Sequence, residues 1–321
     1  MTTIITRKQT RDYVFTEVVD AIEESYRLLG QGQLVLPPRF FTDTENGGDY
    51  LYSAATNLKR KTFVVRGSAF MPWNAGKGVS TVTGAYMYSS FLTGEVLAMV
   101  EGTEVVKLRT AAKSAVAANY LAKKNSSVIG FVGLGQQAKM HAEILTQLFP
   151  ITSLLGYSRN PQGNPEPLTY IKERTGLEVT LLESPQAVAA QADILVVATH
   201  ATEPLVSYAD LHPGQLVLAL DHAESVAKDI VLQAKTYVDY TPTAENENAP
   251  VKMLLQEGKL RIEDIAGELS DLVLQKVPAR TSDEEIILFQ SLGVMNEDLA
   301  TVEYLYERNK GTAESVDLIG E

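Results

Sequence analysis

The sequence contains no cysteine, which excludes disulfides, thiolate nucleophiles and cysteine-ligated metals. A chain without cysteine fits a reducing compartment, so we expect a cytoplasmic protein. Histidine is also scarce. His141, His200 and His212 show no metal-ligand spacing with one another or with nearby carboxylates, so we expect no metal site.

Basic residues are fewer than acidic ones: the sequence has 28 of the former and 40 of the latter, which gives a net charge of -12. Such a chain repels polyphosphate backbones and anionic lipid surfaces, so we expect no nucleic-acid or membrane partner. Long apolar runs are missing too: no stretch approaches the ~18 residues of a membrane span, and residues 1–14 contain no signal-peptide core. The 321 residues, 45% of them hydrophobic, are enough for two folded domains.

The first part of the chain changes from a helical to a β-rich pattern. Apolar residues recur at helical spacing over residues 15–29. The following short β-rich runs predict an antiparallel sheet, with strands at residues 63–65, 79–82, 86–88 and 96–100. The alanine-rich segment 107–123 predicts a helix that can pack closely against a neighbour.

From residue 128 onward, strand and helix patterns alternate. We expect strands at residues 128–132, 152–157, 178–181, 194–198, 216–220 and 236–239, and helices at 137–148 and 167–174. This order predicts an α/β fold with a Rossmann-type doubly wound parallel sheet in residues 113–300. Residues 1–112 together with 301–321 are expected to form a second, α+β domain, on which the helical pattern of residues 283–309 could pack.

Gly133, Gly135 and Ala138 have the G-x-G-x-x-A spacing of a dinucleotide site, between an apolar strand and a helix. Gly133 allows a tight turn, Gly135 lets the backbone approach a pyrophosphate, and Ala138 permits close helix packing. Gln136 and Gln137 complete the candidate loop. The alternative is a tight turn that binds nothing.

The end of the second strand bears on the choice of coenzyme. Sites selective for NAD usually carry an acidic residue there, whereas this chain has Ser158 and Arg159, which suit a 2′-phosphate. We favour NADP, with NAD left open; Arg159 could also be a solvated loop charge. Further candidates for cofactor contacts are Thr81, Thr110, Thr199 and Gly293.

Three separate segments resemble the ornithine cyclodeaminase and mu-crystallin family, which also contains an archaeal-type alanine dehydrogenase and several imine and ketimine reductases. They are the Arg-Thr-Ala-Ala segment at residues 109–112, the glycine loop at 133–138, and C-terminal blocks that include residues 267–271 and 280–285. The resemblance implies a homodimer built through the first domain, with substrate held between the domains.

The resemblance also implies a carboxylate clamp made of Arg39, Arg66 and Arg109. Arg66 stands where the family has a lysine, and a guanidinium binds a carboxylate well but does not give up a proton. Without the resemblance, Arg39 reads as a loop charge and Arg66 as the partner of a carboxylate.

The aspartate that lyase members place after the strand predicted at residues 216–220 is also missing. Ala223 aligns with it, while Asp221 and Glu224 lie nearby as candidate replacements. His222 is a candidate proton donor, because imidazole titrates near neutral pH; it could instead cap a helix.

These features favour an NAD(P)H-dependent reductase or dehydrogenase, in which hydride adds to the C=N carbon of a small amino or imino acid. One alternative is an ornithine cyclodeaminase, a lyase that forms proline and ammonia. Another is a non-enzymatic NADP-dependent ligand-binding protein, since the mu-crystallin branch includes a hormone-binding member. The charged clamp favours catalysis, because an apolar ligand gains nothing from desolvated guanidiniums.

Overall fold

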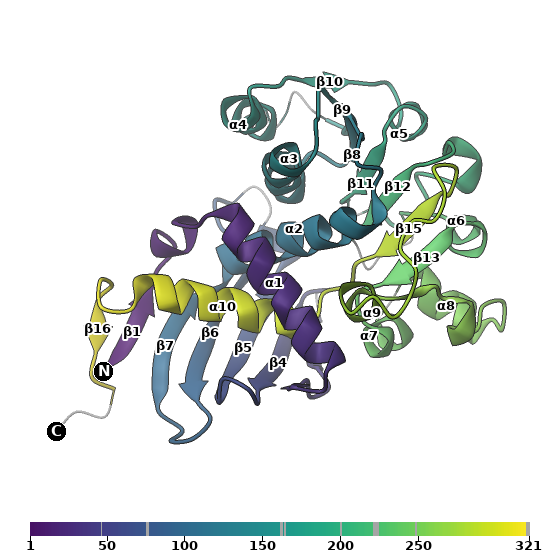
Figure 1. Cartoon of the computed structure of the whole chain (residues 1–321). Helices are drawn as coiled ribbons and strands as arrows, with labels where there is room; N and C mark the ends of the chain where they lie inside the picture. The colour runs from purple at the N-terminus through teal and green to yellow at the C-terminus, as the bar shows by residue number, and fades with distance from the viewer. Residues whose placement is uncertain are drawn as a thin grey trace. The chain divides into compact units, whose positions relative to one another are not determined.

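The computed structural model describes residues 1–45, 47–74, 77–160, 163, 165–199, 201–220, 225–247 and 249–318. The chain divides into two compact units (Figure 1). The first unit comprises Met1–Thr110 and Met295–Glu321, and the second comprises Ala111–Val294.

The first unit is built on a sheet in the order β16-β1-β7-β6-β5-β4-β2, with β3 also paired to β4. Its strands are β1 (Thr2–Ile5), β2 (Leu34–Val35), β3 (Phe40–Asp43), β4 (Asp49–Asn57), β5 (Thr62–Phe70), β6 (Val82–Ser90), β7 (Val96–Glu101) and β16 (Ser315–Val316). The predicted antiparallel arrangement is confirmed from β4 to β7. Residues 79–82 and 86–88 are expected to form two strands, but the structure has the single strand β6, which begins only at Val82. Strand β1, which the sequence pattern does not predict, pairs with β7 in parallel.

Two long helices, α1 (Phe15–Gly30) and α10 (Met295–Asn309), lie side by side on this sheet (Figure 1). The helix predicted at residues 15–29 is thus confirmed. Val18, Ile22 and Tyr26 are fully buried and lie four residues apart, so they form one apolar face of α1. Short 3-10 turns also occur at η1 (Gln9–Arg11) and η2 (Pro72–Asn74).

The second unit contains a parallel sheet in the order β10-β9-β8-β11-β12-β15-β13-β14. Its strands are β8 (Val128–Val132), β9 (Ser153–Tyr157), β10 (Val179–Leu181), β11 (Ile194–Val197), β12 (Leu216–Ala219), β13 (Lys235–Val238), β14 (Gly267–Glu268) and β15 (Ile287–Gln290). The chain runs outward from β8 to β10 and then returns to β11 on the other side of β8, so the predicted doubly wound Rossmann-type topology is confirmed.

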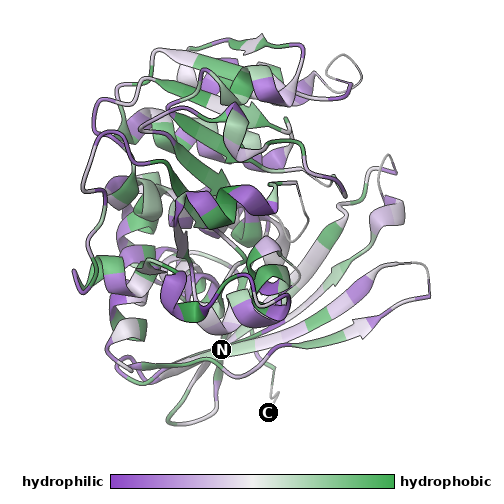
Figure 2. Cartoon of the chain, turned by 90° about the vertical axis from the view of Figure 1, so that its right-hand side faces the viewer, coloured by the Kyte–Doolittle hydropathy of each residue, from purple (hydrophilic) through white to green (hydrophobic). Residues whose placement is uncertain are grey.

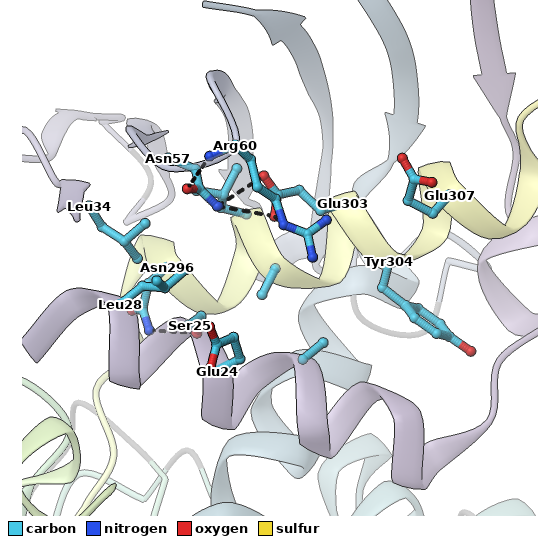
Figure 3. A pocket seen from close by; sticks show the side chains of 13 residues that line it. Glu24, Ser25, Leu28, Leu34, Asn57, Arg60, Asn296, Glu303, Tyr304 and Glu307 are labelled. Atoms are coloured by element: carbon cyan, nitrogen blue, oxygen red, sulfur yellow. Dashed lines mark hydrogen bonds and ion pairs between the residues drawn. The ribbon is translucent and has the colours of Figure 1, made fainter. Parts of the chain in front are cut away.

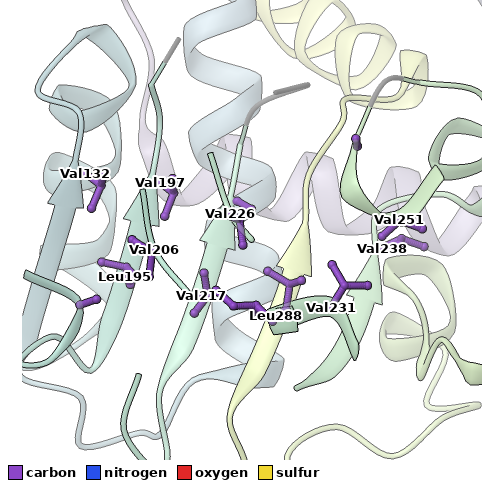
Figure 4. Packing of buried hydrophobic residues seen from close by; sticks show 14 of the residues in the cluster. Val132, Leu195, Val197, Val206, Val217, Val226, Val231, Val238, Val251 and Leu288 are labelled. Carbon is purple, nitrogen blue, oxygen red and sulfur yellow. The ribbon is translucent and has the colours of Figure 1, made fainter. Parts of the chain in front are cut away.

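The central strands β8, β11, β12 and β15 are buried on both faces and are hydrophobic along most of their length (Figure 2). Val132, Val197, Val217 and Leu288 from four neighbouring strands belong to one core cluster (Figure 4). The core therefore fixes the strand ends, where a cofactor would bind.

Helices of several lengths surround the sheet. They are α2 (Gly102–Leu121), which begins in the first unit, α3 (Gln136–Leu148), α4 (Glu166–Thr175), α5 (Pro185–Ala189), α6 (Lys228–Gln233), α7 (Thr241–Asn246), α8 (Pro250–Gln256) and α9 (Leu269–Val273), with 3-10 turns η3 (Tyr208–Asp210) and η4 (Ile262–Asp264). Within the described ranges, no helix combines the length and apolar character needed to cross a bilayer.

The segment 283–309, predicted to be helical throughout, is the main correction. Ile287–Gln290 forms the buried strand β15, and the helix begins only at Met295. A short run of apolar residues shows no periodicity, so its sequence does not distinguish a buried strand from a helix. Residues 295–300, predicted to belong to the Rossmann domain, fall in the first unit.

Candidate functional site

A cluster of buried charges occupies the first unit around the first turn of α10. Arg109 of α2 and Arg66 of β5 face Glu297 and Asp298. Arg109 Nη1 lies 2.6 Å from Glu297 Oε2, and Arg66 Nη1 lies 3.5 Å from Asp298 Oδ1. The two arginine side chains are 10% and 8% exposed, whereas the carboxylates are 0% and 2% exposed. We call these residues, together with Arg39, the arginine cluster.

Two tyrosines hold the carboxylates of the arginine cluster. The Tyr26 hydroxyl donates to Glu297 Oε1 at 2.7 Å, and the Tyr86 hydroxyl donates to Asp298. Tyr86 stands opposite Arg66 in the β5–β6 register, and the guanidinium carbon lies 5.8 Å from its ring centroid. The carboxylates also lie at a helix N-terminus, where the helix dipole favours negative charge. These contacts stabilise charges that would otherwise be costly to bury.

The charged groups of the arginine cluster shift the pKa values of one another. Burial works to raise the pKa of Asp298, but Arg109, Arg66, the Tyr86 hydrogen bond and Arg39 together hold that pKa below its ordinary value. Burial works to lower the pKa of Arg109, yet Asp298 and Glu297 raise it above its ordinary value. Arg109 and Asp298 therefore each stabilise the charged form of the other inside the arginine cluster.

The three arginines predicted as a carboxylate clamp are thus brought together, and their role in binding stays a prediction. Arg39, which is half-buried, acts electrostatically on Asp298. Sequence reasoning missed Glu297, Asp298 and Tyr86 as site residues. A signal for the acids exists, because adjacent carboxylates stand between apolar residues, Met295 before them and Leu299 after them. Tyr86 gives no such signal, since an aromatic residue in a strand reads as core.

The second unit carries the predicted dinucleotide turn between β8 and α3. Gly133 has φ +100°, and a Cβ there would lie 2.3 Å from the carbonyl oxygen of Ala198, so only glycine fits. A Cβ on Gly135 would meet no atom within 4 Å. Packing within the chain therefore does not require a glycine at position 135. The space beside this residue is open and could hold a bound group. Ala138 is fully buried, as close packing of α3 predicts.

The amino end of α3 is suited to an anion. Its N-cap, Gly135, has no side chain to bond the first amides, and Gly135 and Gln136 are exposed while Gln137 is half-buried. Free amides at a helix N-terminus bind phosphate groups. The turn therefore fits the pyrophosphate of a nicotinamide coenzyme.

The carboxyl ends of neighbouring strands bring other predicted cofactor residues to the same edge of the sheet. Ser158, half-buried, and Arg159, exposed, follow β9, while Thr199, half-buried, follows β11. A Cβ on Gly133 would lie 3.4 Å from the Thr199 Cβ, so these strand ends are close together. Contacts of these side chains with a cofactor stay predictions.

Gly293 follows β15 and is held by a buried ion pair. Lys113 Nζ lies 2.7 Å from Asp239 Oδ2, and both side chains are 0% exposed. The same oxygen accepts the amides of Leu292 at 2.7 Å and Gly293 at 2.6 Å. The Gly293 amide is therefore engaged within the chain, and a contact with cofactor would use its other atoms.

The remaining predicted residues are placed elsewhere or not described. Thr81 and Thr110 belong to the first unit, where the Thr110 hydroxyl donates to the Val106 carbonyl at 2.7 Å. Asp221, His222 and Glu224 lie outside the described residues. Their predicted roles stay predictions.

A separate cavity of about 200 Å³ lies between α1, α10 and the end of β4 (Figure 3). Glu303 in its wall accepts hydrogen bonds from Asn57 and Thr62 and lies 3.5 Å from Arg60. Burial raises the pKa of Glu303 despite these partners. The acids of this cavity are therefore already engaged by neighbouring side chains.

Comparisons with known proteins cover nearly all of the chain. The model of the ornithine cyclodeaminase/mu-crystallin family matches residues 3–313. The alanine dehydrogenase of Archaeoglobus fulgidus is 29% identical over 318 residues, which cover 95% of this chain and 94% of the relative. The Thermococcus litoralis Δ1-pyrroline-2-carboxylate reductase in complex with NADH and L-proline superposes with a TM-score of 0.93 at 27% identity, covering 98% of this chain and 100% of the other. An archaeal alanine dehydrogenase dimer with bound NAD gives a TM-score of 0.91 at 27% identity, with 99% of each chain covered.

Proposed function

Because the chain belongs to the ornithine cyclodeaminase/mu-crystallin family, we propose that it is an NAD(P)H-dependent oxidoreductase acting on a small amino or imino acid. The observation that carries this proposal is the arginine cluster, in which Arg66 and Arg109 both contact Asp298 and the buried Nε of Arg109 has no hydrogen bond among the described residues. Relatives named alanine dehydrogenase and Δ1-pyrroline-2-carboxylate reductase support the substrate class.

One group of residues is proposed to bind the coenzyme and another to bind the substrate. The turn at Gly133 and Gly135 and the first amides of α3 hold the coenzyme pyrophosphate. When bound, NAD(P)H supplies the hydride that reduces a C=N carbon. Arg39, Arg66 and Arg109 orient the substrate through its carboxylate, and a guanidinium stays protonated throughout. The nitrogen therefore takes its proton from water or from His222.

The coenzyme preference is proposed to be for NADP. Ser158 and Arg159 follow β9, so a hydroxyl and a guanidinium replace the carboxylate typical of NAD sites. A guanidinium donates to phosphate oxygens in a bidentate manner.

We also propose that the protein is a homodimer that associates through the sheet of the first unit. Large apolar side chains are exposed on one face of β3 and β4: Phe40, which pairs with Tyr52, is 67% exposed, Tyr52 is 49% exposed and Tyr50 is 44% exposed. Apolar patches of this kind mark protein interfaces, and an archaeal alanine dehydrogenase of the same fold is a dimer. Light scattering should give twice the mass of the 35.1 kDa chain.

A cytoplasmic location is proposed from the cysteine-free sequence.

The function is tested by assaying the purified protein with NADPH or NADH against three substrates: Δ1-pyrroline-2-carboxylate, pyruvate with ammonia, and ornithine. We expect coenzyme oxidation with one of the first two. Proline formed from ornithine without net coenzyme turnover would instead establish a cyclodeaminase. Failure of both coenzymes to bind in a calorimetric titration would overturn the proposal.

A further inference from the structure

Two atoms of the arginine cluster have unmet hydrogen-bonding capacity. The Nε of Arg109 is buried and has no hydrogen-bond partner among the described residues. Asp298 Oδ2 lies 3.6 Å from it, which is too far for a hydrogen bond. Within the described part of the chain, the hydrogen bonds to Asp298 come from Tyr86 and Arg66 and end on Oδ1. A buried donor and a carboxylate oxygen thus stand side by side, each without a hydrogen bond.

The neighbouring carboxylate is different. Glu297 accepts from Tyr26 on Oε1 and from Arg109 on Oε2, and its side chain is 0% exposed. Both of its oxygens are engaged, so Glu297 acts as the counter-ion of Arg109. Buried polar groups in folded proteins are nearly always hydrogen-bonded, so the buried Nε of Arg109 calls for a hydrogen-bond acceptor from a ligand.

An α-amino or α-imino acid has the chemistry to satisfy both atoms. Its carboxylate accepts hydrogen bonds and its nitrogen, when protonated, donates them, and both groups are attached to one carbon atom. Their binding partners must therefore be neighbours, as Arg109 Nε and Asp298 Oδ2 are. We propose that Asp298 binds the positively charged nitrogen of the substrate while Arg109 and Arg66 bind its carboxylate.

This inference rests on the proposed function and adds a role for the nitrogen. A carboxylate beside a C=N nitrogen stabilises the protonated imine, the form that accepts hydride. Hydride from the coenzyme adds to the carbon, the C=N electron pair moves to the nitrogen, and the nitrogen keeps its proton and becomes a neutral amine. Asp298 forms no covalent bond in this step.

The test uses two acids of similar shape, L-proline and cyclopentanecarboxylate, of which only proline has a nitrogen. Their dissociation constants are measured by calorimetry in the presence of saturating oxidised coenzyme. We expect the wild-type protein to prefer proline. In Asp298→Asn, which preserves the shape of the side chain, proline should bind about tenfold more weakly or worse. Cyclopentanecarboxylate should bind as well as before or more tightly, because a negative charge beside the arginines is gone.

A matched control is Arg66→Gln, which removes a carboxylate ligand and should weaken both acids equally. The inference is overturned if Asp298→Asn weakens both acids equally, or neither, because Asp298 would then only position the arginines. If this variant does not fold, equal wild-type affinities for the two acids overturn the inference. A wild-type protein that turns over an imino acid without preferring proline refutes this inference alone, whereas one that binds neither acid nor coenzyme refutes the proposed function as well.

Discussion

Each unit buries an ion pair, and the two pairs differ in how completely they are satisfied. In the second unit Asp239 accepts from Lys113 and from the amides of Leu292 and Gly293, with no exposure of either charged side chain. In the arginine cluster of the first unit, Arg109 Nε has no hydrogen bond within the described residues. A buried pair with complete hydrogen bonding fixes the backbone, whereas an incomplete one is prepared for a ligand.

The largest effect is expected from Arg109→Ala. This change leaves Glu297 buried without its cation, which costs about 3–5 kcal/mol of unfolding free energy, and it removes a carboxylate ligand. Urea unfolding measures the first effect, and kcat/KM should fall at least about 100-fold.

A double variant, Arg109→Met with Glu297→Leu, separates stability from binding. Replacing both charges by apolar side chains should restore much of the stability but none of the activity. If kcat/KM were unchanged in Arg109→Ala, the arginine cluster would only stabilise the fold, as the Lys113–Asp239 pair does, and would not bind substrate.

A matched pair of glycine substitutions applies the same distinction to the dinucleotide turn. Gly133→Ala forces a Cβ against the Ala198 carbonyl at positive φ, so we expect a loss of at least about 2 kcal/mol of stability. Gly135→Ala meets no atom of the chain, so stability should stay within about 0.5 kcal/mol. Coenzyme affinity in that variant should fall about tenfold or more, as measured by fluorescence titration. Unchanged coenzyme affinity in Gly135→Ala would show that the open space beside position 135 is not a binding site.

The turn could be predicted from sequence because its determinants are local. Gly133, Gly135 and Ala138 lie within six consecutive positions, and each has a backbone or packing reason that spacing alone reveals. Strand β15 could not be predicted in this way, because its strand character depends on pairing with β12 and β13, which are distant in sequence.

The carboxylates of the arginine cluster escaped prediction for a related reason. Asp298 meets Arg66 and Tyr86, which are 232 and 212 residues away, so no window of sequence contains the contact. The family resemblance pointed to the three arginines. Their counter-ions, Glu297 and Asp298, could be identified only from the folded structure.

His141 in the second unit differs from the Lys113–Asp239 pair, because its buried Nε2 has no hydrogen bond among the described residues. Its Nδ1 donates to the Gln137 carbonyl at 2.8 Å. Burial, aided by the nearby Lys113, lowers the pKa of His141 from 6.5 to about 4. The unfolded chain therefore binds a proton between pH 6.5 and 4 that the folded chain does not, and stability present above pH 6.5 is lost as the pH falls toward 4.

The loss attributable to His141 should reach about 3 kcal/mol at the acidic end of that range. The change to test is His141→Gln, which cannot titrate. Urea midpoints measured across the range should fall less steeply for this variant than for the wild type. Parallel curves for the two proteins would show that His141 contributes nothing to acid sensitivity.

The smallest effect on the fold is expected from Arg159→Ala, because Arg159 is exposed and an exposed charge contributes little to stability. Its proposed contribution is to the 2′-phosphate, where a charge-assisted bidentate contact is far stronger than a surface ion pair. The dissociation constant of NADPH should therefore rise about tenfold while that of NADH stays the same. Ser158→Ala is the control, since loss of a neutral hydroxyl should have a weaker effect in the same direction. Equal weakening of both coenzymes would assign Arg159 to the part of the coenzyme that NAD and NADP share, and the preference for NADP would lose its support.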